Sequence, residues 1–248
     1  MKKIDLNADL GEGYDDAAVM PHISSANIAC GFHAGDAETM RRTVELCVRH
    51  RVAIGAHPSL PDRAGFGRRE MDIQPDEVYA QTRQQIGALA AFANAAGTKL
   101  HHVKPHGALY NMAARDRALA DAIARAVRDS DPDLILVGLA GSVSIDAALE
   151  AGLACAQEAF CDRRYRADGS LTPRSQSGSV IEDIDQAIDQ AVSIAARGEA
   201  VADDGSRVRI EADTLCVHGD RANAGEFARR LREALEHAGL RIAMPERA

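Results

Sequence analysis

The chain has 248 residues and a formal net charge of −8 at neutral pH. An acidic chain without Trp, and without a run that concentrates Lys and Arg, argues against nucleic-acid binding. No apolar run is long enough to cross a membrane, and the charged start lacks the apolar core of a signal peptide. Five cysteines, with no Cys-x-x-Cys pair, are expected to be reduced thiols. We therefore expect a cytoplasmic protein.

Short apolar runs alternate with longer segments of helical periodicity along the whole chain. The expected strands are residues 3–7, 25–30, 52–56, 100–104, 134–139, 155–159 and 214–217. Helical periodicity occurs between them, and Pro75 begins a long helix that ends near Gly97. This alternation predicts a parallel sheet in an α/β fold. Seven or eight such units favour one closed barrel domain, residues 1–248, over an open doubly wound sheet, although element order alone does not exclude the latter.

Two connections, residues 58–74 and 160–180, are too long and polar to be simple turns. Both follow expected strands and contain aromatic residues and arginines, among them Phe66, Arg68 and Arg163. Long ordered loops in compact domains are usually functional. We expect both loops to be ordered and to border the active site.

Polar side chains gather where the expected strands end, which is the edge where parallel α/β folds bind their ligands. Because side chains alternate along a strand, Asn7 and Asp9 lie opposite Leu6. The same alternation places further polar residues on the inner face: His57, His102, Lys104, His106, His218 and Asp220. Since burying such groups is costly, they need one another, a metal or a charged ligand.

These residue types indicate catalysis rather than scaffolding. An inward ammonium at Lys104 requires a carboxylate, a phosphate or a carbonyl oxygen that gains negative charge. Glu12 next to Asp9 is a plausible acid/base partner. A divalent metal is also possible, with Asp9, His33 and His57 as candidate ligands, although no tight ligand spacing occurs. Neither the P-loop nor the dinucleotide glycine motif is present.

Seven sequence blocks in chain order carry a family resemblance. They are NADLGEG (7–13), SANIACGFHAGD (25–36), GAHP (55–58), GFGRR (65–69), KPHGALYN (104–111), Glu158 with DRRY (162–165), and VHGD (217–220). Together they resemble the LamB/YcsF family. The resemblance implies a distorted seven-stranded parallel (β/α) barrel similar to sugar deacetylases. It also implies ATP-dependent opening of 5-oxoproline to glutamate, with ATP and its Mg²⁺ as cofactors and the 5-oxoprolinase subunits B and C as partners.

On this reading the residues divide into two groups. The expected catalytic residues are Asp9, Glu12, His57, Lys104 and His106. The expected substrate-binding residues are Asn7, Asn27, His33, Arg68, Arg69, Tyr110, Glu158, Arg163, His218 and Asp220. Asp9 or His57 would be the general base for water, and Lys104 with His106 would stabilise negative charge. An arginine from the long loops would hold the substrate carboxylate.

Two alternatives stay open at this point. One is a stand-alone metal-dependent amidase or deacetylase that needs no ATP. The other is a non-catalytic subunit that delivers substrate to partner proteins. The inward-facing Lys104 and histidines argue against the second alternative, because delivery alone does not require buried charge.

Overall fold

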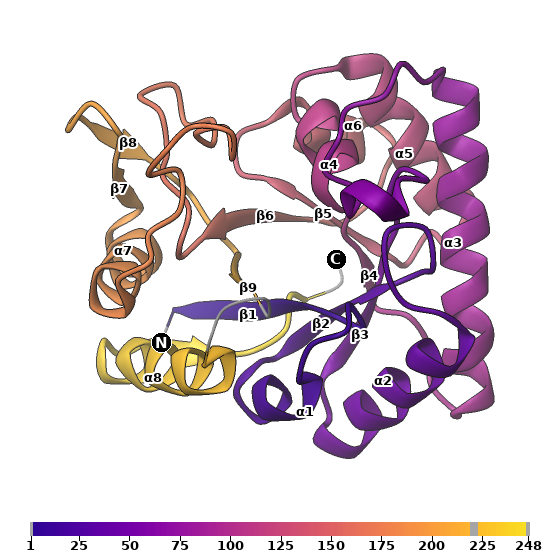
Figure 1. Cartoon of the computed structure of the whole chain (residues 1–248), viewed down its shortest axis with the longest axis horizontal. Helices are drawn as coiled ribbons and strands as arrows, with labels where there is room; N and C mark the ends of the chain where they lie inside the picture. Colours follow the sequence, from indigo (N-terminus) through magenta and orange to yellow (C-terminus); the bar gives the residue numbers. More distant parts are fainter. Residues whose placement is uncertain (1, 219–222, 247–248) are drawn as a thin grey trace.

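The computed structural model describes residues 2–218 and 223–246, and its centre is a closed barrel of parallel strands (Figure 1). Its strands are β1 (Lys3–Leu10), β2 (Ser25–Ala29), β3 (Ala53–His57), β4 (His102–Val103), β5 (Ile135–Leu139), β6 (Cys155–Phe160) and β9 (Thr214–His218). Each strand pairs with the next in this order, and β9 also pairs with β1, which closes the barrel. The predicted α/β fold with a seven-stranded parallel barrel is confirmed.

The fourth strand is shorter than predicted. Sequence favoured residues 100–104, whereas only His102 and Val103 pair as a strand. The flanking backbone still bonds to β3, because the Lys104 N–H donates to the Ala56 carbonyl at 2.9 Å. Pro105, which follows, has no N–H to continue the ladder. The chain therefore turns away at the edge where Lys104 enters the barrel.

Helices enclose the barrel on its outside. They are α1 (Asp16–Val19), α2 (Ala37–His50), α3 (Pro75–Ala95), α4 (Gly107–Ala113), α5 (Arg117–Ser130), α6 (Val143–Glu150), α7 (Ile184–Arg197) and α8 (Ala224–His237). Helices α3, α5 and α6 lie at one end of the view in Figure 1, and α7 and α8 lie at the other. Asp36 caps α2 by accepting a hydrogen bond from the Thr39 N–H at 2.8 Å, and Gly198 ends α7 with a φ of 73°.

Three short strands were not predicted. The strands β7 (Glu199–Val201) and β8 (Arg207–Arg209) form an antiparallel hairpin beside α7, and β10 (Arg241–Ile242) pairs with the start of β1. Each has only two or three residues and is partly exposed, so none is long enough to show a periodic apolar pattern. Within the described residues, no helix has both the length and the apolar character of a membrane span.

Side-chain alternation on the strands separates an apolar core from a polar interior. Leu6 and Leu10 of β1 join a continuous apolar cluster with helix residues such as Leu89. The alternate residues Asp5 and Asn7 are also buried, 2% exposed each, but they bond to polar groups of neighbouring strands. The barrel therefore buries polar groups along its axis and packs its apolar side chains against the helices.

Candidate active site

The deepest polar layer of the barrel is built around Asp5. Its Oδ1 accepts hydrogen bonds from the hydroxyls of Ser24 and Ser25 at 2.7 and 2.8 Å, and its Oδ2 accepts from Thr214 at 2.6 Å. Burial raises the pKa of Asp5 to about 6, although these three donors oppose the shift. Sequence reasoning missed Asp5 and Thr214. The alternation of side chains along β1 could have identified Asp5, because Asp5 and Asn7 point to the same side of the strand.

An amide layer lies above Asp5. The Asn27 Nδ2 donates to Asn7 Oδ1 at 2.7 Å and to Asp9 Oδ1 at 2.8 Å. His102 Nε2 lies 2.8 Å from Asn27 Oδ1, which can only accept, so His102 carries its proton on Nε2. Burial holds the pKa of His102 well below its usual range. Gly55 makes room for this ring, since a Cβ there would lie 2.1 Å from His102 Nε2.

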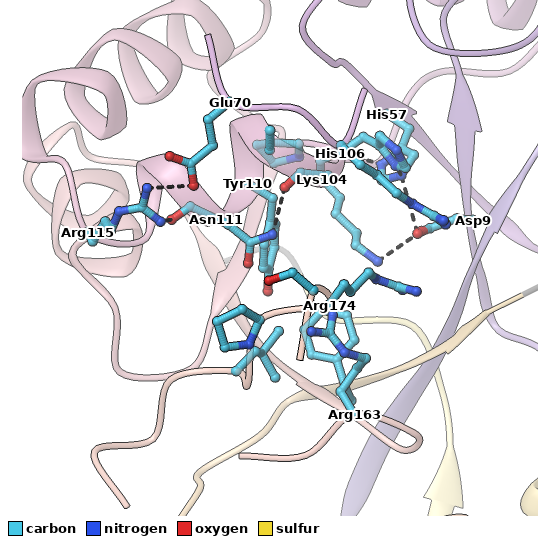
Figure 2. A pocket seen from close by; sticks show the side chains of 18 of the residues that line it. Asp9, His57, Glu70, Lys104, His106, Tyr110, Asn111, Arg115, Arg163 and Arg174 are labelled. Carbon is cyan, nitrogen blue, oxygen red and sulfur yellow. Dashed lines mark hydrogen bonds and ion pairs between the residues drawn. The ribbon is translucent and has the colours of Figure 1, made fainter. Parts of the chain in front are cut away.

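Lys104 is the centre of the next layer. Its Nζ lies 2.9 Å from Asp9 Oδ1 and 2.8 Å from Glu158 Oε1, and it is 3.1 Å from Cys216 Sγ. Burial alone would lower the pKa of Lys104, but the neighbouring carboxylates hold it well above the usual value. Lys104 therefore stays an ammonium and cannot act as a base. Figure 2 shows its side chain crossing the pocket towards Asp9.

Three histidines and Glu12 form the wall beside Lys104. His57 Nε2 lies 2.9 Å from His106 Nδ1 and 3.3 Å from Asp9 Oδ2. The His33 ring stacks on His106 with centroids 3.8 Å apart, and His33 Nε2 lies 2.9 Å from Glu12 Oε1. The ligand atoms of Glu12 and the three histidines all lie within 4.8 Å of one another, so this group could hold a metal ion.

The two long loops supply the outer part of the pocket. Arg163 is buried and donates to the Thr172 carbonyl at 2.7 Å, and burial lowers its pKa to about 10. Arg163 and Arg174 lie together on the side of the pocket away from His57 (Figure 2), and Arg68 also lines it. The cavity they border with Asp9 and Lys104 has a volume of about 360 Å³, in the range of sites for small molecules.

The predicted site residues fall into three sets in the structure. Those that line the cavity are Asp9, Glu12, His57, Arg68, Lys104, His106, Tyr110 and Arg163. Those that are buried but do not line it are Asn7, Asn27, His33 and Glu158. Arg69 points elsewhere and forms an ion pair with Asp62. Asp220 lies outside the described residues, as does the side chain of His218, whose backbone ends β9.

The predicted metal ligands are only partly brought together. Sequence named Asp9, His33 and His57, whereas the structure groups His33 and His57 with Glu12 and His106. Asp9 borders this group: its Oδ1 accepts from Lys104 and Asn27, and its Oδ2 lies 3.3 Å from His57 Nε2. The sequence analysis named His106 and Glu12 as catalytic residues but not as metal ligands. Their spacing along the chain does not reveal that the loop after β1, which carries Glu12, lies next to the end of β3.

The cysteines are free thiols, as expected. Burial raises the pKa of Cys30 to about 12 and holds that of Cys216 well above its usual range. A thiol needs a lowered pKa to act as a nucleophile near neutral pH. Cys216 therefore contributes to the surroundings of Lys104 as a neutral group.

Fold and site together define a (β/α)-barrel protein with a polar pocket at the carboxyl ends of its strands. The chain belongs to the LamB/YcsF family, whose family model matches residues 4–248. It is 57% identical over 245 residues to the 5-oxoprolinase A subunit of Bordetella pertussis, covering 96% of this chain and 97% of that one. It is 54% identical over 248 residues to the 5-oxoprolinase A subunit of Tolumonas auensis, covering 98% and 99%.

Solved structures agree with this placement. The lactam utilization protein of Thermus thermophilus is 51% identical and superimposes with a TM-score of 0.91, covering 97% of this chain and 99% of that chain. A structure described as T48 deacetylase with substrate has a TM-score of 0.53 at 12% identity, covering 98% of this chain and 87% of that one. At that identity the likeness concerns the fold alone, which is deacetylase-like as predicted.

Proposed function

We propose that this chain opens 5-oxoproline to glutamate in an ATP-dependent reaction, together with the 5-oxoprolinase subunits B and C. The observation that carries the proposal is the ammonium of Lys104, held between Asp9 and Glu158 in a pocket with arginines on its outer side. The names of the relatives, 5-oxoprolinase A subunit and lactam utilization protein, support a lactam as the substrate.

The reaction has a definite requirement for charge and protons. A five-membered lactam is a resonance-stabilised amide, so ATP activates it by transferring its terminal phosphoryl group to the carbonyl oxygen. Water then adds to the carbonyl carbon and gives up a proton, and the C–N bond breaks as the ring nitrogen takes a proton. The acyl phosphate that is left reacts with a second water, which yields glutamate and phosphate beside the ADP already formed.

The pocket offers a group for each requirement. Asp9 and His57 both line it and can accept the proton from water. The fixed charge of Lys104 can stabilise negative charge that develops on the carbonyl or phosphoryl oxygens. Arg163 and Arg174 can hold the substrate carboxylate, since a guanidinium binds a carboxylate through two parallel hydrogen bonds.

The test is reconstitution. The chain is incubated with 5-oxoproline and ATP, with and without subunits B and C, and glutamate and phosphate are followed together. We expect both products in equal amounts from the complete system. Asp9→Asn should lower glutamate formation at least about 100-fold, whereas Asp76→Asn, at a fully exposed carboxylate, should not change it. Full turnover by Asp9→Asn, or glutamate formation without this chain, would refute the proposal.

A stand-alone metal-dependent amidase is the second candidate, and the group of Glu12 with three histidines favours it. It predicts that the chain alone releases glutamate from 5-oxoproline without ATP and that a chelator stops the reaction. A non-catalytic delivery subunit would instead tolerate Asp9→Asn with unchanged turnover. The same reconstitution therefore separates all three functions.

A further inference from the structure

We propose that Glu12, His57 and His106 form a binding site for one divalent transition-metal ion of the Zn²⁺ type in the wall of the pocket. Only the use of the ion in lactam opening rests on the proposed function. The binding itself rests on the geometry of these three side chains and of the groups that hold them.

The hydrogen bonds of His57 and His106 determine where their protons lie. His57 Nδ1 is 2.6 Å from the Lys104 carbonyl, and His106 Nε2 is 2.9 Å from the Phe66 carbonyl. A carbonyl oxygen can only accept, so each of these nitrogens carries the N–H. The other nitrogens, His57 Nε2 and His106 Nδ1, then face each other at 2.9 Å with two lone pairs when both rings are neutral. Two lone pairs repel at this distance unless a proton or a metal cation lies between them.

The distances among the three side chains suit a metal. His57 Nε2 and His106 Nδ1 lie 3.9 and 3.5 Å from Glu12 Oε1 and 2.9 Å from each other. Ligands at about 2.0–2.1 Å from a tetrahedral ion are about 3.3 Å apart. The three atoms therefore need only small movements to bind one ion. All three residues line the cavity, so a fourth position would open to substrate or water.

The surroundings of the three residues also fit a metal site. Ligating histidines usually donate their second N–H to a backbone carbonyl or a carboxylate, as His57 and His106 do here. His33 is fully buried, does not line the cavity and lies 2.9 Å from Glu12 Oε1. We assign His33 as a positioning residue that donates Nε2–H to Glu12 and fixes this carboxylate.

The surroundings of Glu12 point the same way. Lys104 forms ion pairs with Asp9 and Glu158, whereas Glu12 lies next to the imidazoles of His33 and His106. A carboxylate largely removed from water is costly without a cation beside it. A divalent ion between Glu12 and the two histidines of the proposed site supplies this positive charge.

Two imidazoles and one carboxylate favour a borderline ion such as Zn²⁺ or Co²⁺ over Mg²⁺, which prefers oxygen ligands and keeps its water shell. Two His and one Glu with an open position is a ligand set of catalytic zinc sites. Such an ion supplies Lewis-acid chemistry to water or to the lactam carbonyl. With His57 Nε2 occupied as a ligand, Asp9 is left as the general base for water.

The test measures metal binding on the isolated, tag-free chain without ATP, lactam or partners. The metal-free protein is titrated with Zn²⁺ by calorimetry and with Co²⁺ by visible absorption. We expect one ion per chain, a Co²⁺ band from nitrogen ligation, and no competition from millimolar Mg²⁺. Because no turnover is measured, a negative result overturns the metal site without affecting the lactam reaction, and failed reconstitution leaves the metal site intact.

Matched variants make the result specific. His106→Gln and Glu12→Gln should each weaken Zn²⁺ binding at least about 100-fold. Glu12→Gln keeps the size of the side chain and removes only its charge. His33→Asn should weaken it about 10- to 100-fold, as expected for a residue that positions a ligand. His50→Gln, at an exposed histidine of α2, should bind like the original chain. Unchanged affinity in both His106→Gln and Glu12→Gln, with melting temperatures near that of the original, would refute the assignment.

Discussion

Lys104→Met isolates the role of the buried ammonium, because methionine keeps much of the side-chain length but removes the charge. In the structure the Nζ is within 2.9 Å of both Asp9 Oδ1 and Glu158 Oε1. Removing one partner of a buried ion pair costs about 3–5 kcal/mol of stability. Losing one fixed donor for developing negative charge costs about 100- to 1,000-fold in kcat. The variant should therefore lose both activity and stability.

Activity is measured as glutamate formation in the reconstituted system, and stability is measured by thermal melting. Lys99→Met, at an exposed lysine just before β4, is the control and should change neither quantity. A Lys104→Met enzyme that keeps more than about a tenth of kcat, or that melts at the same temperature as the original chain, would refute the assigned role.

Two further predictions concern the barrel interior. Burial raises the pKa of Asp5 to about 6, so its ionisation removes up to about 3 kcal/mol of stability as the pH rises from about 4 through 6. Asp5→Asn should therefore make the melting temperature less dependent on pH over this range. A pH dependence of melting equal to that of the original chain would contradict the raised pKa. Gly55→Ala would place a Cβ 2.1 Å from His102 Nε2 and should cost at least about 1–3 kcal/mol in urea unfolding. Gly87→Ala in α3, where a Cβ meets nothing within 4 Å, should instead be neutral or stabilising by up to about 1 kcal/mol. Equal changes in unfolding free energy for Gly55→Ala and Gly87→Ala would contradict the close packing of Gly55 against His102.

The order of strands and helices was readable from the sequence, because apolar periodicity is a local property of the chain. Pro75 at the start of α3 and Gly198 at the end of α7 lie where their backbone preferences predict. The inward parity of Asp9 and Lys104 was also readable, since alternation along a strand follows from the pleat. The hairpin β7–β8 was missed because its strands have only three residues each and are partly exposed, which is too short for a periodic pattern.

By itself the sequence determined the alternation of parallel strands with helices and which strand ends carry polar groups, because both follow from periodicities of two and 3.6 residues. It favoured a closed barrel, and the pairing of β9 with β1 decided it. Only the tertiary structure decided which of these groups meet. It turned Arg69 to Asp62 and brought Arg174 to the pocket with Arg163. It also set Glu12 beside His106, 94 positions further along the chain. Such contacts depend on how loops fold over the barrel mouth, which is governed by packing between distant segments and leaves no local pattern.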